Sequence, residues 1–137
     1  MDFLDYKQLA EDLFDSMARC PKIPMEEPRE FTRGEMGILV FLSFNKDGIT
    51  SGDLSDGLSV STGRIATALK SLEKKELIIR RTDPEDKRRV NVFITEEGKR
   101  LVLDKQHQGI ERMTKALKKL DEKEVVEFVR LVKKIIS

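Results

Sequence analysis

The sequence has few of the residues that carry most metal and redox chemistry. It contains one cysteine, Cys20, and one histidine, His107. A single cysteine cannot form a disulfide within the chain, which excludes a small secreted scaffold held by disulfides and indicates a reducing compartment. A zinc site of the His/Cys type needs more ligands than these two residues supply. We therefore expect no metal and no cofactor.

Motifs of the common catalytic sites are also missing. The chain has no glycine-rich phosphate loop and no serine elbow, and no nucleophile stands near His107 in the polar stretch DKQHQG. The many carboxylates fall at positions typical of solvated helix faces. We expect no catalytic residues and hence no enzyme.

No segment has the composition of a membrane span. The N-terminal sequence MDFLDYKQLAEDLF is acidic from its second residue, and it lacks the basic and apolar regions of a signal peptide. The longest apolar run, residues 36–44, is far too short to cross a bilayer. The expectation is a cytoplasmic protein with no membrane partner.

Charge is abundant and unevenly distributed. Of 137 residues, 37% are charged and 39% hydrophobic, which suits one folded domain with a strongly charged surface. The net charge is only +1, yet residues 61–92 hold nine Lys or Arg against five Asp or Glu, while the rest of the chain holds 17 against 20. Positive charge focused on one segment of a near-neutral protein is typical of a nucleic-acid contact site.

Two helices are predicted before this basic segment. Apolar residues at helical spacing predict an amphipathic helix over residues 2–19, and prolines make residues 21–30 a loop. A second helix is expected to begin at Thr32, with Glu35 placed for a capping box. Its nearly continuous apolar run predicts burial on most sides.

A helix-turn-helix followed by a hairpin is predicted next. After one extended residue, Ile49, a short helix SGDLSDGL is capped by Thr50 or Ser51. A tight turn leads to a second helix that Ser61 caps. Two β-rich runs, LIIRRT and VNVFIT, are then joined by a charged turn. This order of elements is that of a winged helix-turn-helix.

The last third predicts two more helices, the first capped by Thr95 and the second opened by Asp121. Together with the first helix, they must bury three apolar stripes, and a small winged domain offers little surface for that. We expect a homodimer, with a monomer that folds these helices onto its own core as the alternative. The expected dimerisation residues are Leu9, Leu13, Leu117, Phe128, Val132 and Ile135.

In the winged plan, the second helix of the helix-turn-helix presents its N-terminal residues to base edges in the DNA major groove. Small polar side chains let the helix end approach closely, and hydroxyl and backbone N–H groups can bind phosphate. Arg64 can pair with guanine. The alternative is that Ser61 is only an N-cap and Arg64 a solvated charge. The candidate contacts on this helix are Ser61, Thr62, Gly63, Arg64, Thr67 and Lys70.

The turn of the hairpin carries three adjacent cations, Lys87, Arg88 and Arg89, directly after Asp86. An arginine in a wing can enter the narrow, negative minor groove. A preceding carboxylate can orient the guanidinium through a bidentate pair. The alternative is a solvated turn with ordinary surface charges. We predict that Asp86 and the three cations belong to the DNA-binding site.

The stretch from residue 49 to 100 resembles the MarR (multiple antibiotic resistance regulator) family of winged-helix transcription factors. The most specific part is Asp86-Lys87-Arg88 with the strand VNVFITEEG, which is similar to the family's Asp-x-Arg wing signature. The resemblance implies that Arg88 is the minor-groove arginine, that Asp86 is its partner, and that the terminal helices interlock with a second subunit. Many members have a threonine and an arginine where this chain has Arg64 and Thr67, so the resemblance does not specify its base contacts or its operator sequence.

The predicted fold is mainly α with a small β-hairpin, in a single domain over residues 1–137. Residues 30–100 form the winged helix-turn-helix lobe, and residues 1–20 and 101–137 form the dimerisation helices. The predicted function is a ligand-responsive repressor that binds double-stranded, palindromic operator DNA as a homodimer. The small-molecule effector and its binding residues are not specified by the sequence. The alternatives are an activator, a ligand-independent regulator, or a winged-helix adaptor that binds only proteins.

Cys20 has two interpretations. Some members of the resembled family sense oxidants through a cysteine on the first helix, and Cys20 lies at the end of that helix. A lone cysteine is more often a small packed hydrophobe, and that is the expectation here.

Overall fold

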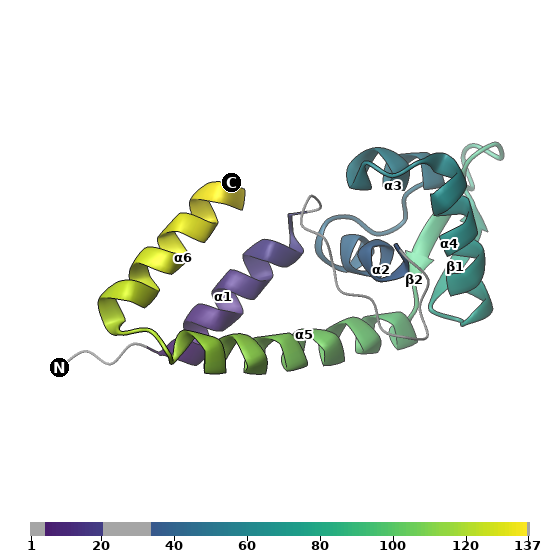
Figure 1. The fold of residues 1–137 in the computed structure, drawn as a ribbon. Helices are drawn as coiled ribbons and strands as arrows, with labels where there is room; N and C mark the ends of the chain where they lie inside the picture. The colour runs from purple at the N-terminus through teal and green to yellow at the C-terminus, as the bar shows by residue number, and fades with distance from the viewer. Residues whose placement is uncertain (1–4, 21–33, 137) are drawn as a thin grey trace. The chain divides into compact units, whose positions relative to one another are not determined.

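The computed structural model describes residues 5–20 and 34–136, which form helices and one two-stranded antiparallel sheet (Figure 1). The fold is mainly helical with a single hairpin, as predicted. Contacts divide the chain into two compact units, one made of residues up to Cys20 and from Leu103 onward, the other of the residues between them. The elements are α1 (Tyr6–Ala18), α2 (Glu35–Phe44), α3 (Ser51–Leu58), α4 (Thr62–Lys74), β1 (Ile78–Thr82), β2 (Val90–Ile94), α5 (Glu96–Leu117) and α6 (Glu122–Ile136).

The start of α2 differs from the prediction. The helix begins at Glu35 behind Gly34, whose φ of +97° is left-handed and which provides no side-chain cap. Glycine adopts this conformation without a steric penalty. Glu35 is fully buried and pairs with Lys75, so its predicted role in a capping box is wrong. A buried carboxylate is stabilised by a cation far more than by a helix end. The predicted cap, Thr32, lies outside the described residues.

The core of the 34–102 unit forms around α2. This helix packs against α3, α4 and β2. The predicted burial of its apolar run is confirmed, and so is the inward face of α4. The buried residues of these two helices are Met36, Ile38, Leu39, Val40, Leu42, Ile65, Ala68, Leu69 and Leu72.

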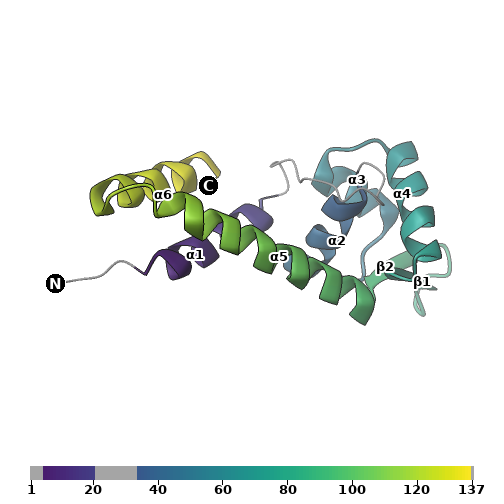
Figure 2. The same cartoon turned by 60° about the horizontal axis from the view of Figure 1, so that its bottom comes forward.

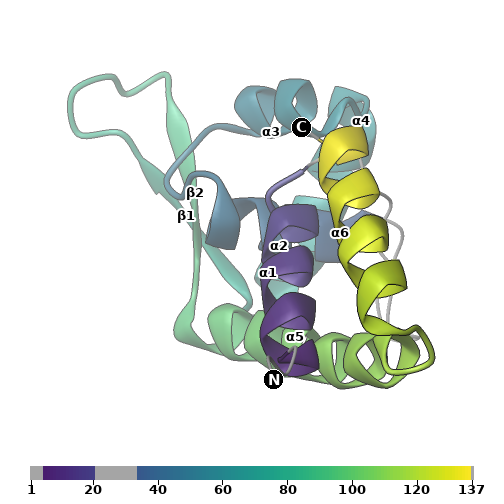
Figure 3. The ribbon, with the colours of Figure 1, turned by 90° about the vertical axis from the view of Figure 1, so that its left-hand side faces the viewer.

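The hairpin pairs Ile78 with Ile94 at its base and Thr82 with Val90 near its tip. Ile49 forms an isolated bridge to Val92, which confirms the single extended residue before α3. Ile78, Val92 and Ile94 are buried at the base. The strands and their connecting loop extend beyond the helices of this unit (Figure 3). The hairpin is therefore anchored at one end and free at the other.

In the other unit, α1 and α6 lie side by side (Figures 1 and 3). The buried centre of this unit consists of Ala10, Leu117, Val125 and Val129. The hydroxyl of Tyr6 donates a hydrogen bond to the carbonyl of Leu120 at 3.2 Å, which ties the start of α1 to the turn before α6.

Two of the predicted dimerisation residues, Leu13 and Leu117, are fully buried within one chain. Leu9 packs against the same centre, and Val132 is half-buried. Phe128 and Ile135 are exposed to 40% and 80%. The outer face of α6 is thus the part of the predicted interface that one chain leaves uncovered.

Among the residues described, no helix is both long enough and apolar enough to span a bilayer.

Candidate nucleic-acid interface

The helix-turn-helix begins with a reciprocal cap. The Thr50 hydroxyl accepts a hydrogen bond from the Asp53 N–H at 3.1 Å, and the Asp53 carboxylate accepts one from the Thr50 N–H at 3.2 Å. Thr50, rather than Ser51, is therefore the cap of α3. The hydrogen bond from the Thr50 backbone lowers the pKa of Asp53 most, the Thr50 side chain lowers it further, and the charge of Arg89 contributes less. Asp53 consequently holds a fixed negative charge at the start of α3.

A short turn connects α3 to α4. Ser59 caps α3 in a left-handed conformation with φ of 55°. The buried Ser55 donates its hydroxyl hydrogen to the carbonyl of Val60, and its own carbonyl accepts from the Val60 N–H at 3.1 Å. The turn is closed by these contacts, which set the direction in which α4 leaves it.

The helix α4, drawn as a ribbon in Figure 2, carries exposed polar side chains at its N-terminus. Ser61 is its N-cap, as predicted, and accepts a hydrogen bond from the Arg64 N–H at 3.3 Å. The Thr67 hydroxyl donates to the Gly63 carbonyl at 3.1 Å, so it is satisfied within the helix. All six candidate contacts on this helix are exposed, namely Ser61, Thr62, Gly63, Arg64, Thr67 and Lys70.

Gly63 is not required by the packing of the chain itself. A Cβ built on it meets no atom within 4 Å beyond its own helix backbone and chain neighbours, and its φ is not positive. Glycine in a helix costs roughly 0.5–1 kcal/mol relative to alanine. A missing side chain at an exposed helix start fits a surface that an external partner approaches closely.

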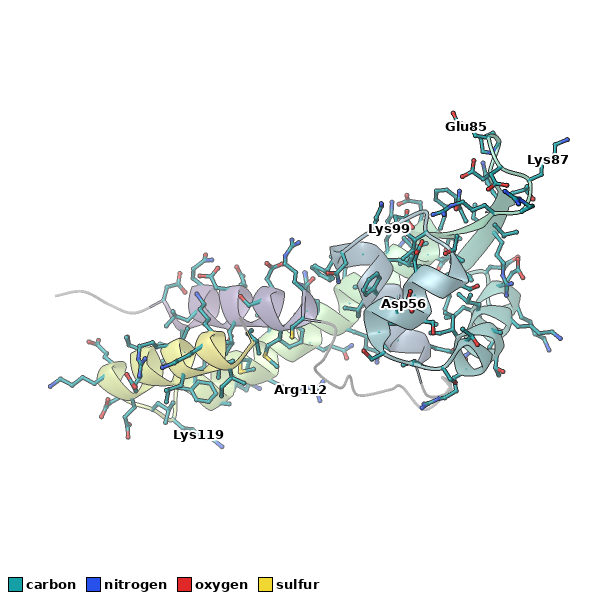
Figure 4. The ribbon with its side chains drawn as sticks, turned by 90° about the horizontal axis from the view of Figure 1, so that it is seen from above. Asp56, Glu85, Lys87, Lys99, Arg112 and Lys119 are labelled. Carbon is teal, nitrogen blue, oxygen red and sulfur yellow. The ribbon has the colours of Figure 1, made fainter. Side chains whose placement is uncertain are left out.

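The wing loop is shaped by Asp83. Its carboxylate accepts hydrogen bonds from the Glu85 N–H at 2.9 Å and from the Asn91 side-chain amide at 3.1 Å. These bonds, in that order, lower the pKa of Asp83. Glu85 and Lys87 lie at the free end of the hairpin and point away from it (Figure 4).

Arg88 has 93% of its side chain accessible, against 46% for Arg89. Its Nε lies 3.3 Å from Oδ1 of Asp86, and the same oxygen accepts the Arg88 backbone N–H at 3.0 Å. Asp86 does contact the guanidinium, but through one nitrogen, so the predicted bidentate pair is wrong. With only one residue between them in a tight loop, the carboxylate lies beside the base of the side chain and cannot face the guanidinium fork.

Arg89 differs from its two neighbours. Its Nη2 lies 3.3 Å from Oδ2 of Asp53 on α3, and its Nε lies 3.3 Å from Oδ1 of Asn91 and 3.8 Å from Oδ2 of Asp83. Sequence reasoning grouped Arg89 with the other wing cations and assigned no role to Asp53 or Asp83. The spacing of Thr50 and Asp53 could have predicted a capping carboxylate at the start of α3. It could not have predicted that this carboxylate also contacts Arg89.

Five of the nine cations in residues 61–92 make no ion pair with any residue that the structure describes. They are distributed over α4, β1 and the wing loop, and all are exposed. Arg81 on β1 was not among the predicted contacts. Such charges are available to neutralise phosphates. The five are Arg64, Lys70, Lys74, Arg81 and Lys87.

The described residues contain no cluster of three or more His, Cys, Asp or Glu side chains that could hold a metal ion.

The short helix, the tight turn, the exposed second helix and the hairpin define a winged helix-turn-helix domain. Residues 30–89 match the model of the MarR family, so this part of the chain is similar to that family. The comparison with curated proteins gives no match.

Solved structures of regulators have the same fold. A mutant of Staphylococcus aureus MepR is 28% identical, covering 77% of this chain and 78% of its own, with a TM-score of 0.65. The S. aureus MepR–DNA complex is 25% identical, covering 94% and 87%, with a TM-score of 0.64. Streptococcus pneumoniae FabT in complex with DNA, at 20% identity, 78% and 74% coverage and a TM-score of 0.68, supports the fold alone.

Proposed function

We propose that this protein is a sequence-specific DNA-binding regulator that represses transcription by occupying a palindromic operator as a homodimer. The observation that carries the proposal is the exposed polar N-terminus of α4, in the same lobe as a hairpin with a free cationic tip. The likeness to MepR, which has been solved bound to DNA, supports it.

The major-groove contact is assigned to the first turn of α4. Thr62 and Gly63 let the helix end approach the bases, and the backbone N–H groups of this turn face a phosphate. Arg64, exposed and without an ion pair in the described part of the chain, can donate two hydrogen bonds to a guanine. Lys70, further along the same helix, neutralises the backbone.

The minor-groove contact is assigned to the wing. Arg88 keeps most of its side chain in solvent, so inserting it into the minor groove breaks no buried contact. Lys87 at the tip supplies phosphate contacts, and Arg81 on β1 is a further candidate for them.

A second copy of the chain is assigned to the outer face of α6. Apolar side chains on this face remain exposed, and contiguous apolar surface of this kind marks an interaction site. They are Phe128 at 40%, Leu131 at 44% and Ile135 at 80%, which share one side of the helix, whereas Val126, exposed to 52%, lies on another side. A two-fold dimer presents two copies of α4 and two wings, and a palindromic site matches that symmetry.

Regulation is assigned to a small-molecule effector that binds one spacing of the two DNA-binding lobes more tightly than another. Only such a difference in affinity can shift the balance between DNA-bound and free protein.

Selection from random duplex DNA tests the proposal. We expect a two-fold symmetric sequence to be enriched, and its affinity to fall steeply with salt because bound cations release counterions. Reporter transcription from that sequence should fall when the protein is present. Failure to enrich any sequence, with no salt-dependent duplex binding, would favour the protein-binding adaptor.

A further inference from the structure

The guanidinium of Arg89 lies beside several acceptors, although 46% of its side chain is accessible to solvent. Its guanidinium has three described partners, Asp53, Asp83 and Asn91, within 3.3–3.8 Å. Two of them, Asp83 and Asn91, belong to the hairpin itself. The third, Asp53, lies at the start of α3, 36 residues earlier in the chain. Arg89 therefore connects the wing to the helix-turn-helix.

The other contacts that join the hairpin to the rest of its lobe lie nearer its base. Arg80 on β1 pairs with Glu73 on α4 at 3.6 Å, and the Ile94 N–H donates to Oδ1 of Asp47 at 3.0 Å. The Ile49–Val92 bridge joins the two parts near the base of the hairpin. Asp86 contacts Arg88, and Asp83 contacts Glu85, Asn91 and Arg89, so these polar contacts stay within the hairpin. The Arg89–Asp53 pair thus restrains the sideways movement of the hairpin between its base and Arg88 at the tip.

The chemistry of the pair favours arginine over lysine. A guanidinium can donate to Asp53 through Nη2 and to Asn91 through Nε at the same time, because its planar fork holds both N–H groups in fixed directions. An ammonium on a flexible stem cannot reproduce both contacts. The carboxylate of Asp53 is itself held by Thr50, so the anchor on α3 does not move freely.

We propose that Arg89 is a positioning residue for DNA recognition: with Asp53 it fixes the wing relative to α4, so that the major-groove and minor-groove contacts form together. This inference rests on the proposed DNA-binding function. In this inference Arg89 has a different role from Lys87 and Arg88, to which the proposed function assigns contacts with DNA. A wing fixed before binding loses less conformational freedom on the duplex, and this lowers the free energy cost of association.

The sharpest variant is Asp53→Asn. It removes a negative charge near the DNA-facing surface, so electrostatics alone predicts tighter binding. Positioning predicts the opposite, roughly two- to tenfold weaker binding for each wing that is released. The asparagine oxygen can still accept the hydrogen bond from the Thr50 N–H, so the cap of α3 is retained. The same oxygen, Oδ2, accepts from Arg89, so the variant loosens the contact to the wing by removing its charge and does not abolish it. The matched control is Asp56→Asn, an exposed carboxylate on the same helix without an ion pair among the described residues (Figure 4).

Arg89 is tested by comparing lysine with glutamine. If Arg89 positions the wing, Arg89→Lys and Arg89→Gln weaken binding to a similar extent, and both leave the salt dependence unchanged. If Arg89 contacts a phosphate, Arg89→Lys keeps most of the affinity. In that case Arg89→Gln lowers the salt slope by about one unit per wing.

The experiment measures affinity for the selected duplex at several salt concentrations and amide hydrogen exchange of residues 83–91 in the free dimer. We expect Asp53→Asn to weaken binding, to speed exchange in the wing, and to add nothing to Arg89→Gln in the double variant. If Asp53→Asn behaves like Asp56→Asn in both measurements while the parent binds DNA, the inference is overturned and the proposed function stands. If the parent binds no duplex, the proposed function fails and the inference fails with it.

Discussion

The Nζ of Lys75 lies 2.7 Å from Oε2 of Glu35, which joins the end of α4 to the first residue of α2. The Glu35 side chain has no exposed surface, whereas that of Lys75 keeps 30%. A carboxylate removed from water in this way remains charged only beside a cation or strong hydrogen-bond donors. The pair therefore holds the C-terminal end of the proposed recognition helix against the core of its lobe.

Replacing Lys75 by alanine should lower the free energy of unfolding by about 3 kcal/mol. This is the low end of the range for breaking a buried ion pair, because Lys75 is partly solvated. The control is Lys74→Ala, an exposed neighbour that makes no ion pair in the described part of the chain and should change stability by less than about 0.5 kcal/mol. Urea denaturation compares the two. Equal stability of both variants would show that the pair contributes nothing.

Acid titration should detect two carboxylates with a lowered pKa, Asp53 in the cap of α3 and Asp83 in the wing loop. Hydrogen bonds from Thr50 hold the pKa of Asp53 below its ordinary value of 3.8, and bonds from Glu85 and Asn91 do the same for Asp83. Since the folded pKa is lower than the unfolded one, the stability they contribute is present above about pH 3.8 and is lost as the pH falls through the folded value. Carboxyl carbon NMR should give midpoints below 3.8 for both.

The same titration on Arg89→Gln provides a further check. The midpoint of Asp53 should stay below 3.8, because the Thr50 hydrogen bonds are the largest cause of the shift and they remain. A midpoint that returns to 3.8 in this variant would mean that the charge of Arg89, and not the cap, holds Asp53 ionised.

The elements that could be predicted are those that local patterns determine. Ser61 as a cap, the buried stripe of Ile65 and Leu69, and the extended Ile49 before α3 follow from capping chemistry and periodicity within a few residues. The start of α2 could not be predicted in this way. It depends on Glu35 meeting Lys75, which is 40 residues away in the chain.

The candidate site was predictable in its position but not in its internal contacts. The exposed face of α4 follows from the helical period, which places Arg64 and Thr67 opposite the buried residues. The sequence pattern gives no reason to assign different roles to the three adjacent cations of the wing, Lys87, Arg88 and Arg89. Arg89 differs from Arg88 only because the folded hairpin brings it to Asp53, a tertiary contact that no local pattern records.

Gly63→Ala should separate stability from binding. Its new methyl group meets no atom within 4 Å in the free protein, and alanine favours the helix, so stability should rise by up to about 1 kcal/mol. Binding to the selected duplex should nevertheless weaken, because the methyl group stands between the helix end and the DNA. Thermal unfolding and duplex titration of one preparation measure both. Unchanged or tighter binding would place α4 outside the groove.

Ile135→Asp should weaken the proposed dimer without unfolding the chain. Ile135 is 80% exposed in one chain, so the carboxylate is solvated in the monomer but buried and unpaired at an interface. Light scattering should give about 32 kDa for the parent, twice the chain mass of 15.8 kDa, and a lower mass for the variant on dilution. Lys133→Ala, exposed on the same helix, is the control. A parent at monomer mass would remove the argument for a palindromic operator.

Arg88→Ala tests the wing itself. If Arg88 lies in the minor groove, the change should cost about 1–3 kcal/mol of operator binding and make the salt slope shallower by about one unit per wing, since one cation fewer displaces counterions. Asp86→Ala should do less harm to binding, because it leaves the positive charge of Arg88 in place. It removes the 3.3 Å contact to the guanidinium and the 3.0 Å hydrogen bond from the Arg88 backbone N–H. Stability should not change in Arg88→Ala, whose side chain is 93% accessible, whereas Asp86→Ala should lose the small contribution of its hydrogen bond to the backbone.

Arg64→Ala should differ from Arg88→Ala in kind. A major-groove arginine identifies a base edge, whereas a wing arginine responds mainly to groove width and charge, so only Arg64→Ala should relax the preference at one base position in each half-site. Competition between the selected duplex and single-base variants, repeated at several salt concentrations, separates the two effects. If Arg88→Ala binds like the parent at every salt concentration, the hairpin is an ordinary surface turn, and DNA recognition must be assigned to α4 alone.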